Sequence, residues 1–229
     1  MPVCAAAPFA RDDVLAAGDP RWQPHDMLRL RRLGTFDGEP AWVRAAFARA
    51  PFAVVRRAQA AAGFIAVGVR GSARNERYGT WVRSDDIDAV FRPEALLPSR
   101  SALAAYRAAL PAFVALDALY RDASCFGSLV WGPAGSVGFE LAARVPTVTP
   151  TSDLDLLIRT PDYLPHDEAR HIQAALDRHA AHAATRIDAQ LDTPAGGVAL
   201  AEYASGKARV MARHASGPGL VADPWAPCR

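Results

Sequence analysis

The segment Asp153-Leu154-Asp155-Leu156-Leu157-Ile158 constrains the fold of this 229-residue chain more than any other. It begins with alternating acidic and apolar residues, and a period of two predicts a β-strand with one face in a hydrophobic core. Both carboxylates then lie on the same face of that strand. Two like charges side by side are unfavourable unless a cation lies between them, so the strand also predicts a cation site.

A second acidic strand is expected after an intervening helix. Residues 165–183 predict the helix, because a proline can occupy its first turn, acidic residues follow, and apolar residues recur at helical spacing. The segment Arg186-Ile187-Asp188-Ala189-Gln190-Leu191 then alternates again. If the two strands are neighbours, Asp188 joins Asp153 and Asp155. The order strand, helix, strand predicts an α/β core with three acids at one site.

Two unequal parts are expected along the chain. Residues 1–100 contain strand-like runs at 52–55 and 64–69 and a short helical stretch at 40–50. After them the pattern becomes rich in alanine and leucine at helical spacing. We therefore expect a smaller N-terminal α/β part that binds substrate or partner, followed by a catalytic domain at 101–229. The fold class is α/β (α+β), with a mixed sheet and helices.

Composition narrows the class of protein. Hydrophobic residues make up 51% and charged residues 22%, as in folded globular proteins, and a net charge of +2 is too small for a dedicated duplex-DNA binder. Cys4, Cys125 and Cys228 are far apart and lack metal-site spacing, which fits a reducing cytoplasm. No signal-peptide pattern or membrane-length apolar run occurs. We expect a soluble cytoplasmic protein without nucleic-acid or membrane partners.

The acids suggest metal-dependent chemistry when a second motif is considered. A lone Asp-x-Asp pair could be a solvated strand edge, but Gly127-Ser128 lies upstream of Asp153 and Asp155. Glycine allows a phosphate to approach the backbone closely, and a serine at a helix start donates hydrogen bonds to it. Three carboxylates, with Asp188, can hold two Mg²⁺ ions. The combination predicts a magnesium site that activates an attacking hydroxyl and binds a triphosphate.

Residues 120–190 resemble the nucleotidyltransferase superfamily of the polymerase β type, whose signature is Gly-Ser, then Asp-x-Asp, then a later acid. A closer resemblance covers most of the chain, to the malonate decarboxylase holo-acyl-carrier-protein synthases, also called phosphoribosyl-dephospho-CoA transferases. The segments that carry it are 24–28 (PHDML), 68–71 (GVRG), 127–131 (GSLVW), 152–157 (SDLDLL), 186–190 (RIDAQ), 217–218 (GP) and 223–225 (DPW).

The resemblance implies a particular reaction. The phosphoribosyl-dephospho-CoA group would pass from triphosphoribosyl-dephospho-CoA to a serine of the acyl carrier protein subunit of malonate decarboxylase, releasing pyrophosphate. By carry-over, Asp153 and Asp155 hold both metal ions, and Asp188 completes the acceptor-side metal site and could assist deprotonation of the serine. Gly127 and Ser128 would hold the triphosphate.

Other interpretations stay open. Arg70, Arg74 and Arg77 lie in a loop-like segment that could bind phosphate, dock an acidic carrier protein, or form a solvated turn. An enzyme using an ordinary nucleoside triphosphate on another acceptor would need the same three acids. A non-catalytic binding module of the same fold is a third alternative, but a scaffold has no physical need to hold three like charges together.

Overall fold

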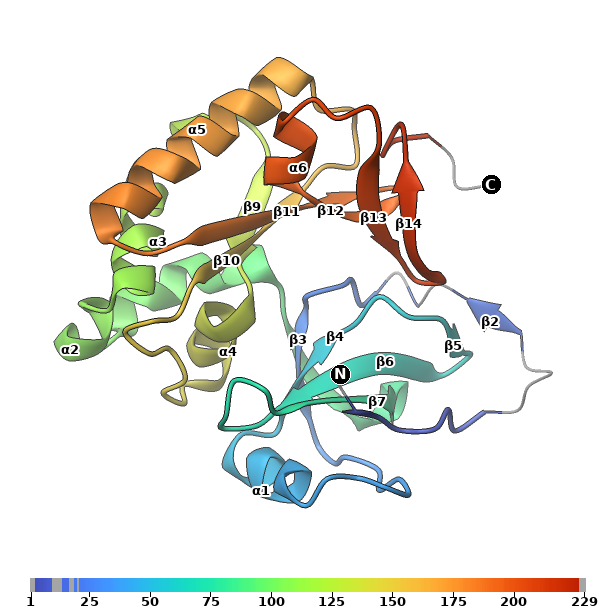
Figure 1. Cartoon of the computed structure of the whole chain (residues 1–229). Helices are drawn as coiled ribbons and strands as arrows, with labels where there is room; N and C mark the ends of the chain where they lie inside the picture. Colours follow the sequence, from blue (N-terminus) through green and yellow to red (C-terminus); the bar gives the residue numbers. More distant parts are fainter. Residues whose placement is uncertain (1–2, 10–13, 17–18, 20, 227–229) are drawn as a thin grey trace. The chain divides into compact units, whose positions relative to one another are not determined.

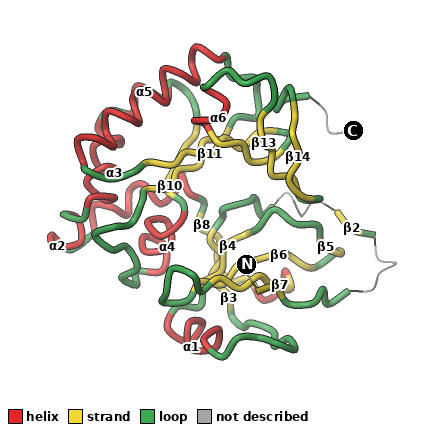
Figure 2. The backbone as a smooth tube through the Cα atoms, in the orientation of Figure 1, coloured by secondary structure: helices red, strands yellow, loops and turns green. Residues whose placement is uncertain are grey.

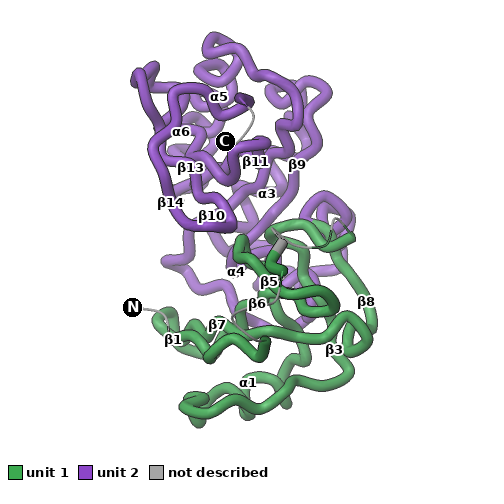
Figure 3. Tube along the Cα trace, turned by 90° about the vertical axis from the view of Figure 1, so that its right-hand side faces the viewer, with its two compact units in different colours: residues 1–92 green, residues 93–229 purple. Residues whose placement is uncertain are grey.

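The computed structural model describes residues 3–9, 14–16, 19 and 21–226. It divides into two compact units, Met1–Arg92 and Pro93–Arg229, which Figure 3 shows in different colours. The units divide between residues 92 and 93, whereas we expected a boundary near residue 100. Residues 93–102 belong to the second unit because they form the 3-10 helix η2 (Pro93–Ala102), which contacts β9 (Val130–Pro133) and α4 (Gly135–Ala143).

The first unit is built on a six-stranded sheet. Its strands lie in the order β1 (Val3–Cys4), β7 (Arg77–Arg83), β6 (Phe64–Arg70), β4 (Phe52–Val55), β3 (Met27–Leu30) and β8 (Ile87–Phe91). A separate pair joins β2 (Leu15–Ala16) to β5 (Ala60–Ala61), and the 3-10 turn η1 (Ser84–Asp86) precedes β8. Helix α1 (Trp42–Arg49) contacts β6 and buries Val43 and Ala46. The predicted helix and both predicted strands of this part are confirmed.

The second unit contains a second six-stranded sheet and most of the helices. Its strands lie in the order β14 (Gly217–Val221), β13 (Val210–His214), β12 (Gly196–Ala199), β11 (Ile187–Thr193), β10 (Leu154–Arg159) and β9. The remaining helices are α2 (Ala105–Ala108), α3 (Pro111–Arg121), η3 (Ala123–Phe126), α5 (His166–Ala183) and α6 (Leu200–Ala204). Strands β10 and β11 are parallel and the other neighbours antiparallel, so the predicted mixed α+β fold is confirmed.

The parallel pair β10–β11 lies between β12 and the edge strand β9 of this sheet. A parallel connection needs a long crossover, and α5 supplies it. In Figures 1 and 2, α5 lies on one side of the pair and α4 on the other, and α3 packs against α5 and β10. Because both faces are covered, Leu156, Leu157 and Ile158 are all buried. The predicted alternation therefore holds only at the beginning of the strand, where Asp153 and Asp155 are partly exposed.

Local sequence explains where α5 begins and ends. Pro165 occupies the position before the helix, and Asp167 and Glu168 lie in its first turn, where carboxylates interact favourably with the helix dipole. Ala184 adopts a left-handed conformation (φ 51°) and ends it. No helix within the described ranges is long and apolar enough to cross a membrane. Cys4 and Cys125 are free, and Cys228 lies outside the described residues.

Candidate active site

The strand register brings the three predicted acids together. In the parallel pair β10–β11, Asp155 lies directly opposite Asp188, while Asp153 immediately precedes β10. Residues opposite each other in a sheet share a face, so the Asp155 and Asp188 side chains leave the sheet on the same side. The predicted pairing of these strands is confirmed. The catalytic role of the acids stays a prediction.

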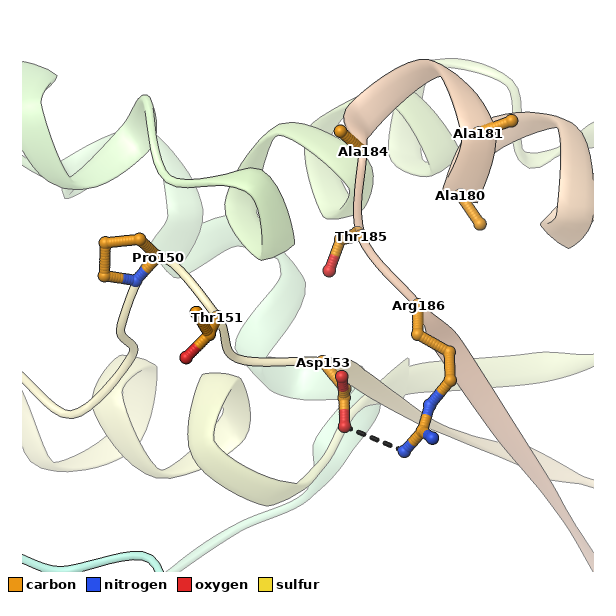
Figure 4. A pocket seen from close by; sticks show the side chains of 8 residues that line it. All are labelled: Pro150, Thr151, Asp153, Ala180, Ala181, Ala184, Thr185 and Arg186. Carbon is orange, nitrogen blue, oxygen red and sulfur yellow. Dashed lines mark hydrogen bonds and ion pairs between the residues drawn. The ribbon is translucent and has the colours of Figure 1, made fainter.

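An arginine connects two of these carboxylates. Arg186 precedes β11, and its Nη2 lies 2.8 Å from Oδ2 of Asp153 and 2.7 Å from Oδ2 of Asp188. Figure 4 shows the bond to Asp153. The exposed fractions of the side chains are 64% for Arg186, 23% for Asp153 and 49% for Asp188. Arg186 therefore compensates the acidic charge from the solvent side.

The absence of a side chain at Gly135 makes room for the Asp155 carboxylate. Gly135, the first residue of α4, has φ 54°, and a Cβ there would collide with the carboxylate of Asp155. Both the left-handed backbone and the close approach require glycine. The carboxylate thus lies against the start of α4, where backbone N–H groups favour negative charge, and the next residue, Ser136, is 8% exposed. The Gly135-Ser136 pair therefore borders the acidic site.

The predicted Gly127-Ser128 turn lies elsewhere, which corrects its expected location. Gly127 ends η3 and both residues are exposed. Strand β9 follows them and runs antiparallel to β10, with Val130 opposite Arg159. At about 3.3 Å per residue, that end of β10 is roughly 13 Å from Asp155. The structure therefore does not bring Gly127 and Ser128 to the carboxylates.

The sequence contains a signal that distinguishes Gly135-Ser136 from Gly127-Ser128. This pair lies between the apolar strand β9 and the apolar residues of α4, so its serine starts a helix. The Gly127-Ser128 pair is followed by a strand and has no helix N-terminus to offer a phosphate. Position relative to the next helix, more than the dipeptide itself, distinguishes the two turns.

The three arginines Arg70, Arg74 and Arg77 belong to the first unit. Arg70 ends β6, Arg77 begins β7 opposite it, and Arg74 lies in the turn between them. Glu76 organises this turn, because its carboxylate accepts a hydrogen bond from the N–H of Ala73 at 2.8 Å. The acids lie in the other unit. Substrate binding by these arginines stays a prediction.

A buried ion pair missed by the sequence analysis holds the segment that leads to Asp153. Glu140 of α4 is 4% exposed and accepts hydrogen bonds from Nε and Nη2 of Arg107 at 2.8 and 2.6 Å. It also accepts bonds from the N–H groups of Thr147 and Val148. Burial alone would raise the pKa of Glu140, but these bonds outweigh it and hold the pKa below its ordinary value. The pair fixes residues 145–148 against α4.

The acidic site fits Mg²⁺ in donor chemistry. Carboxylate oxygens are the ligands that Mg²⁺ prefers, and two of them converge on one point, which a cationic nitrogen of Arg186 occupies. Among the residues that the structure describes, no group of three or more His, Cys, Asp or Glu side chains is arranged to hold a metal ion. Metal binding at this site therefore requires the carboxylates to move inward and Arg186 to move away.

The site and the comparison with known proteins together show which class of protein this chain is. Acids on adjacent strands beside a glycine-started helix suit transfer of phosphate-linked groups, and the chain is a transferase. It belongs to the phosphoribosyl-dephospho-CoA transferase family. Residues 95–224 match the family described as phosphoribosyl-dephospho-CoA transferase MdcG C-terminal domain, and residues 23–93 match the corresponding N-terminal domain.

Named relatives agree over nearly their whole length. A phosphoribosyl-dephospho-CoA transferase of Pseudomonas aeruginosa is 42% identical over 204 residues, covering 89% of this chain and 93% of the relative. One from Pseudomonas putida (strain W619) is 42% identical over 205 residues, covering 89% and 95%. One from Azotobacter vinelandii is 40% identical over 207 residues, covering 89% and 94%. No solved structure matches the chain significantly.

Proposed function

We propose that this enzyme transfers the phosphoribosyl-dephospho-CoA group from triphosphoribosyl-dephospho-CoA to a serine of the malonate decarboxylase acyl carrier protein, with release of pyrophosphate. The observation that carries the proposal is the register of Asp155 opposite Asp188 with Asp153 beside them, in a chain of this transferase family. Like charges on neighbouring strands serve no structural purpose and suit a site for phosphate transfer.

The reaction exchanges one phosphorus–oxygen bond for another. The serine oxygen of the carrier attacks the α-phosphorus of the triphosphate, a bond forms between them, and the bond from the α-phosphorus to the bridging oxygen breaks. Pyrophosphate leaves with the electron pair of that bond. The hydroxyl proton passes to a base, for which Asp188 is our candidate because it is the most exposed of the three acids.

The residues of the chain have separate tasks in this proposal. Asp153, Asp155 and Asp188 would hold Mg²⁺, which neutralises phosphate charge and favours ionisation of the attacking hydroxyl. Gly135 and Ser136 would hold the triphosphate at the start of α4, the task we first expected of Gly127 and Ser128. A helix N-terminus offers backbone N–H groups to a phosphate, and Gly135 has no side chain to obstruct them.

The test is transfer to the isolated carrier. The enzyme is incubated with Mg²⁺, apo carrier protein and either triphosphoribosyl-dephospho-CoA or ATP, and the intact carrier is weighed. A mass increase equal to the phosphoribosyl-dephospho-CoA group supports the proposal. Modification by ATP alone would favour a transferase of ordinary nucleotides, and no modification by either donor would favour a binding module.

A matched pair of variants tests the phosphate-binding turn. Ser136→Ala is expected to raise the KM for the donor by about tenfold or more, since a hydrogen bond to a charged group contributes about 1.5–3 kcal/mol. Ser128→Ala, which removes the same atom from the other Gly-Ser pair, should leave the KM unchanged. A raised KM for Ser128→Ala together with an unchanged KM for Ser136→Ala would instead assign triphosphate binding to Gly127-Ser128.

A further inference from the structure

Arg186 occupies a point on which two carboxylates converge. Its Nη2 is within 2.8 Å of Asp153 and 2.7 Å of Asp188. Mg²⁺ binds carboxylate oxygens at about 2.0–2.1 Å, so the same oxygens could not coordinate a cation while the guanidinium lies between them. The arginine and a metal ion are therefore alternatives at this point.

The arginine is placed so that it can leave. Its side chain is 64% exposed, and it stands in the short connection between α5 and β11. Exposed ion pairs of this kind contribute little to stability, and a divalent cation interacts with two carboxylates more strongly than a single exposed guanidinium does. Binding of a metal ion would displace the guanidinium at little cost.

A pocket adjoins the Arg186 side chain. Its volume is about 500 Å³, and Figure 4 shows Asp153 and Arg186 at its edge together with Thr151 and Thr185. The remaining lining residues have small or apolar side chains: Pro150, Ala180, Ala181 and Ala184. When a metal ion compensates Asp153, the remaining charge that faces the pocket is the guanidinium, whose planar N–H groups match a phosphate.

We propose that Arg186 holds the metal position of the empty enzyme, yields it to a divalent cation, and then binds a phosphate group of the substrate at this pocket. This inference rests on the metal-dependent transfer proposed above. The phosphate could belong to the triphosphate end of the donor or to the diphosphate within its dephospho-CoA part.

The first test measures metal binding without any phosphate compound. Mn²⁺ replaces Mg²⁺, and free Mn²⁺ is followed by its electron paramagnetic resonance signal. Arg186→Gln should bind Mn²⁺ about three- to tenfold more tightly than wild type, because the two exposed ion pairs of Arg186 no longer compete with the metal ion. The control Arg170→Gln removes an exposed arginine of α5 that pairs with Asp167, and its affinity should equal that of wild type. Unchanged or weaker binding by Arg186→Gln overturns the proposal.

The second test measures phosphate binding at saturating Mn²⁺. Calorimetry with pyrophosphate and, separately, with dephospho-CoA should show about tenfold weaker binding of one of them to Arg186→Gln. Loss with pyrophosphate assigns the pocket to the triphosphate end, and loss with dephospho-CoA assigns it to the CoA part. Equal affinities of wild type and variant for both compounds overturn the proposal.

Two further measurements keep these results interpretable. Arg186→Lys retains a positive charge and should lie between wild type and Arg186→Gln in both assays, and thermal unfolding checks that each variant is folded. If wild type itself fails to bind Mn²⁺ with or without pyrophosphate, the proposed metal-dependent function fails. If wild type binds Mn²⁺ and pyrophosphate, and Arg186→Gln binds them with the same affinities, only the proposed role of Arg186 fails.

Discussion

The two ends of the β10–β11 pair carry opposite arrangements of charge. Near its beginning, Asp155 lies opposite Asp188, two like charges in register. At its other end, Arg159 lies opposite Asp192, with Nη1 to Oδ2 at 2.7 Å and the Glu94 carboxylate 3.8 Å away. The paired end is largely buried, with 11% of Arg159 and 17% of Asp192 exposed, whereas Asp188 is 49% exposed.

The difference separates a structural use of charge from a functional one. A buried charge is costly unless it is paired, so Arg159 and Asp192 compensate each other where solvent is scarce. At the acidic end, like charges persist because solvent and Arg186 screen them. Like charges in register at a solvent-accessible end of the strands therefore mark the side of the sheet where a cationic ligand is expected.

The largest expected effect is on activity at the acidic end. Asp155→Asn should lower the rate of transfer about 100- to 1,000-fold, because it removes a charge that holds the metal ion. Stability should hold or rise, since repulsion from Asp188 is relieved. Intact-mass assays of the carrier and thermal unfolding measure the two quantities. Activity within tenfold of wild type at saturating Mg²⁺ would contradict the metal-site assignment.

The opposite response is expected at the paired end. Arg159→Met should reduce the free energy of unfolding by about 3 kcal/mol, because it leaves the Asp192 carboxylate largely buried without its arginine. Metal affinity of the folded variant should match that of wild type. Urea unfolding and Mn²⁺ titration are the measurements. A stable variant with weakened metal binding would show that the two ends are not separable.

A pair of glycines sharpens the comparison of the ends. Gly135 and Gly127 have nearly equal φ values of 54° and 55°, in a region that favours glycine. Only at Gly135 would the new Cβ strike Asp155, while at Gly127 the nearest atom is 4.0 Å away. Gly135→Ala should therefore lose the transfer activity that Gly127→Ala retains, as intact-mass assays of the carrier would measure. Equal activity of the two variants would mean that Asp155 can move aside freely.

The smallest expected effect concerns pH. The pKa of Glu140 is lowered in the folded state, so its contribution to stability is complete above its ordinary pKa of about 4.5 and is lost as pH falls through the lowered value. The double variant Glu140→Gln with Arg107→Met should show a flatter loss of stability below about pH 4.5. Denaturant titrations between about pH 3 and pH 6 test this. Identical pH slopes for the double variant and wild type would assign the acid sensitivity to other carboxylates.

Prediction from sequence succeeded where local patterns dominate. The helix 165–183, the strands at 52–55 and 64–69 and the neighbouring acidic strands are all found, because periodicity, a helix-starting proline and turn residues act over short distances. The burial of Leu157 was not predicted by alternation, since it depends on α4 covering the second face of β10. The Gly-Ser pair beside the acids was also not predicted, because two Gly-Ser pairs are locally similar and only one of them lies at the start of a helix next to Asp155.

By itself, the sequence predicted the mixed fold class from residue type and spacing, indicated the family through its resemblance to known proteins, and singled out the three acids as candidates. Only the tertiary structure decided which residues meet those acids. Register set Asp155 opposite Asp188 and carried Gly127 to the far end of β9, while the start of α4 brought Gly135 against Asp155. Arg186 likewise reaches two carboxylates from different parts of the chain. Such contacts depend on how strands pair across long loops, which no short-range pattern encodes.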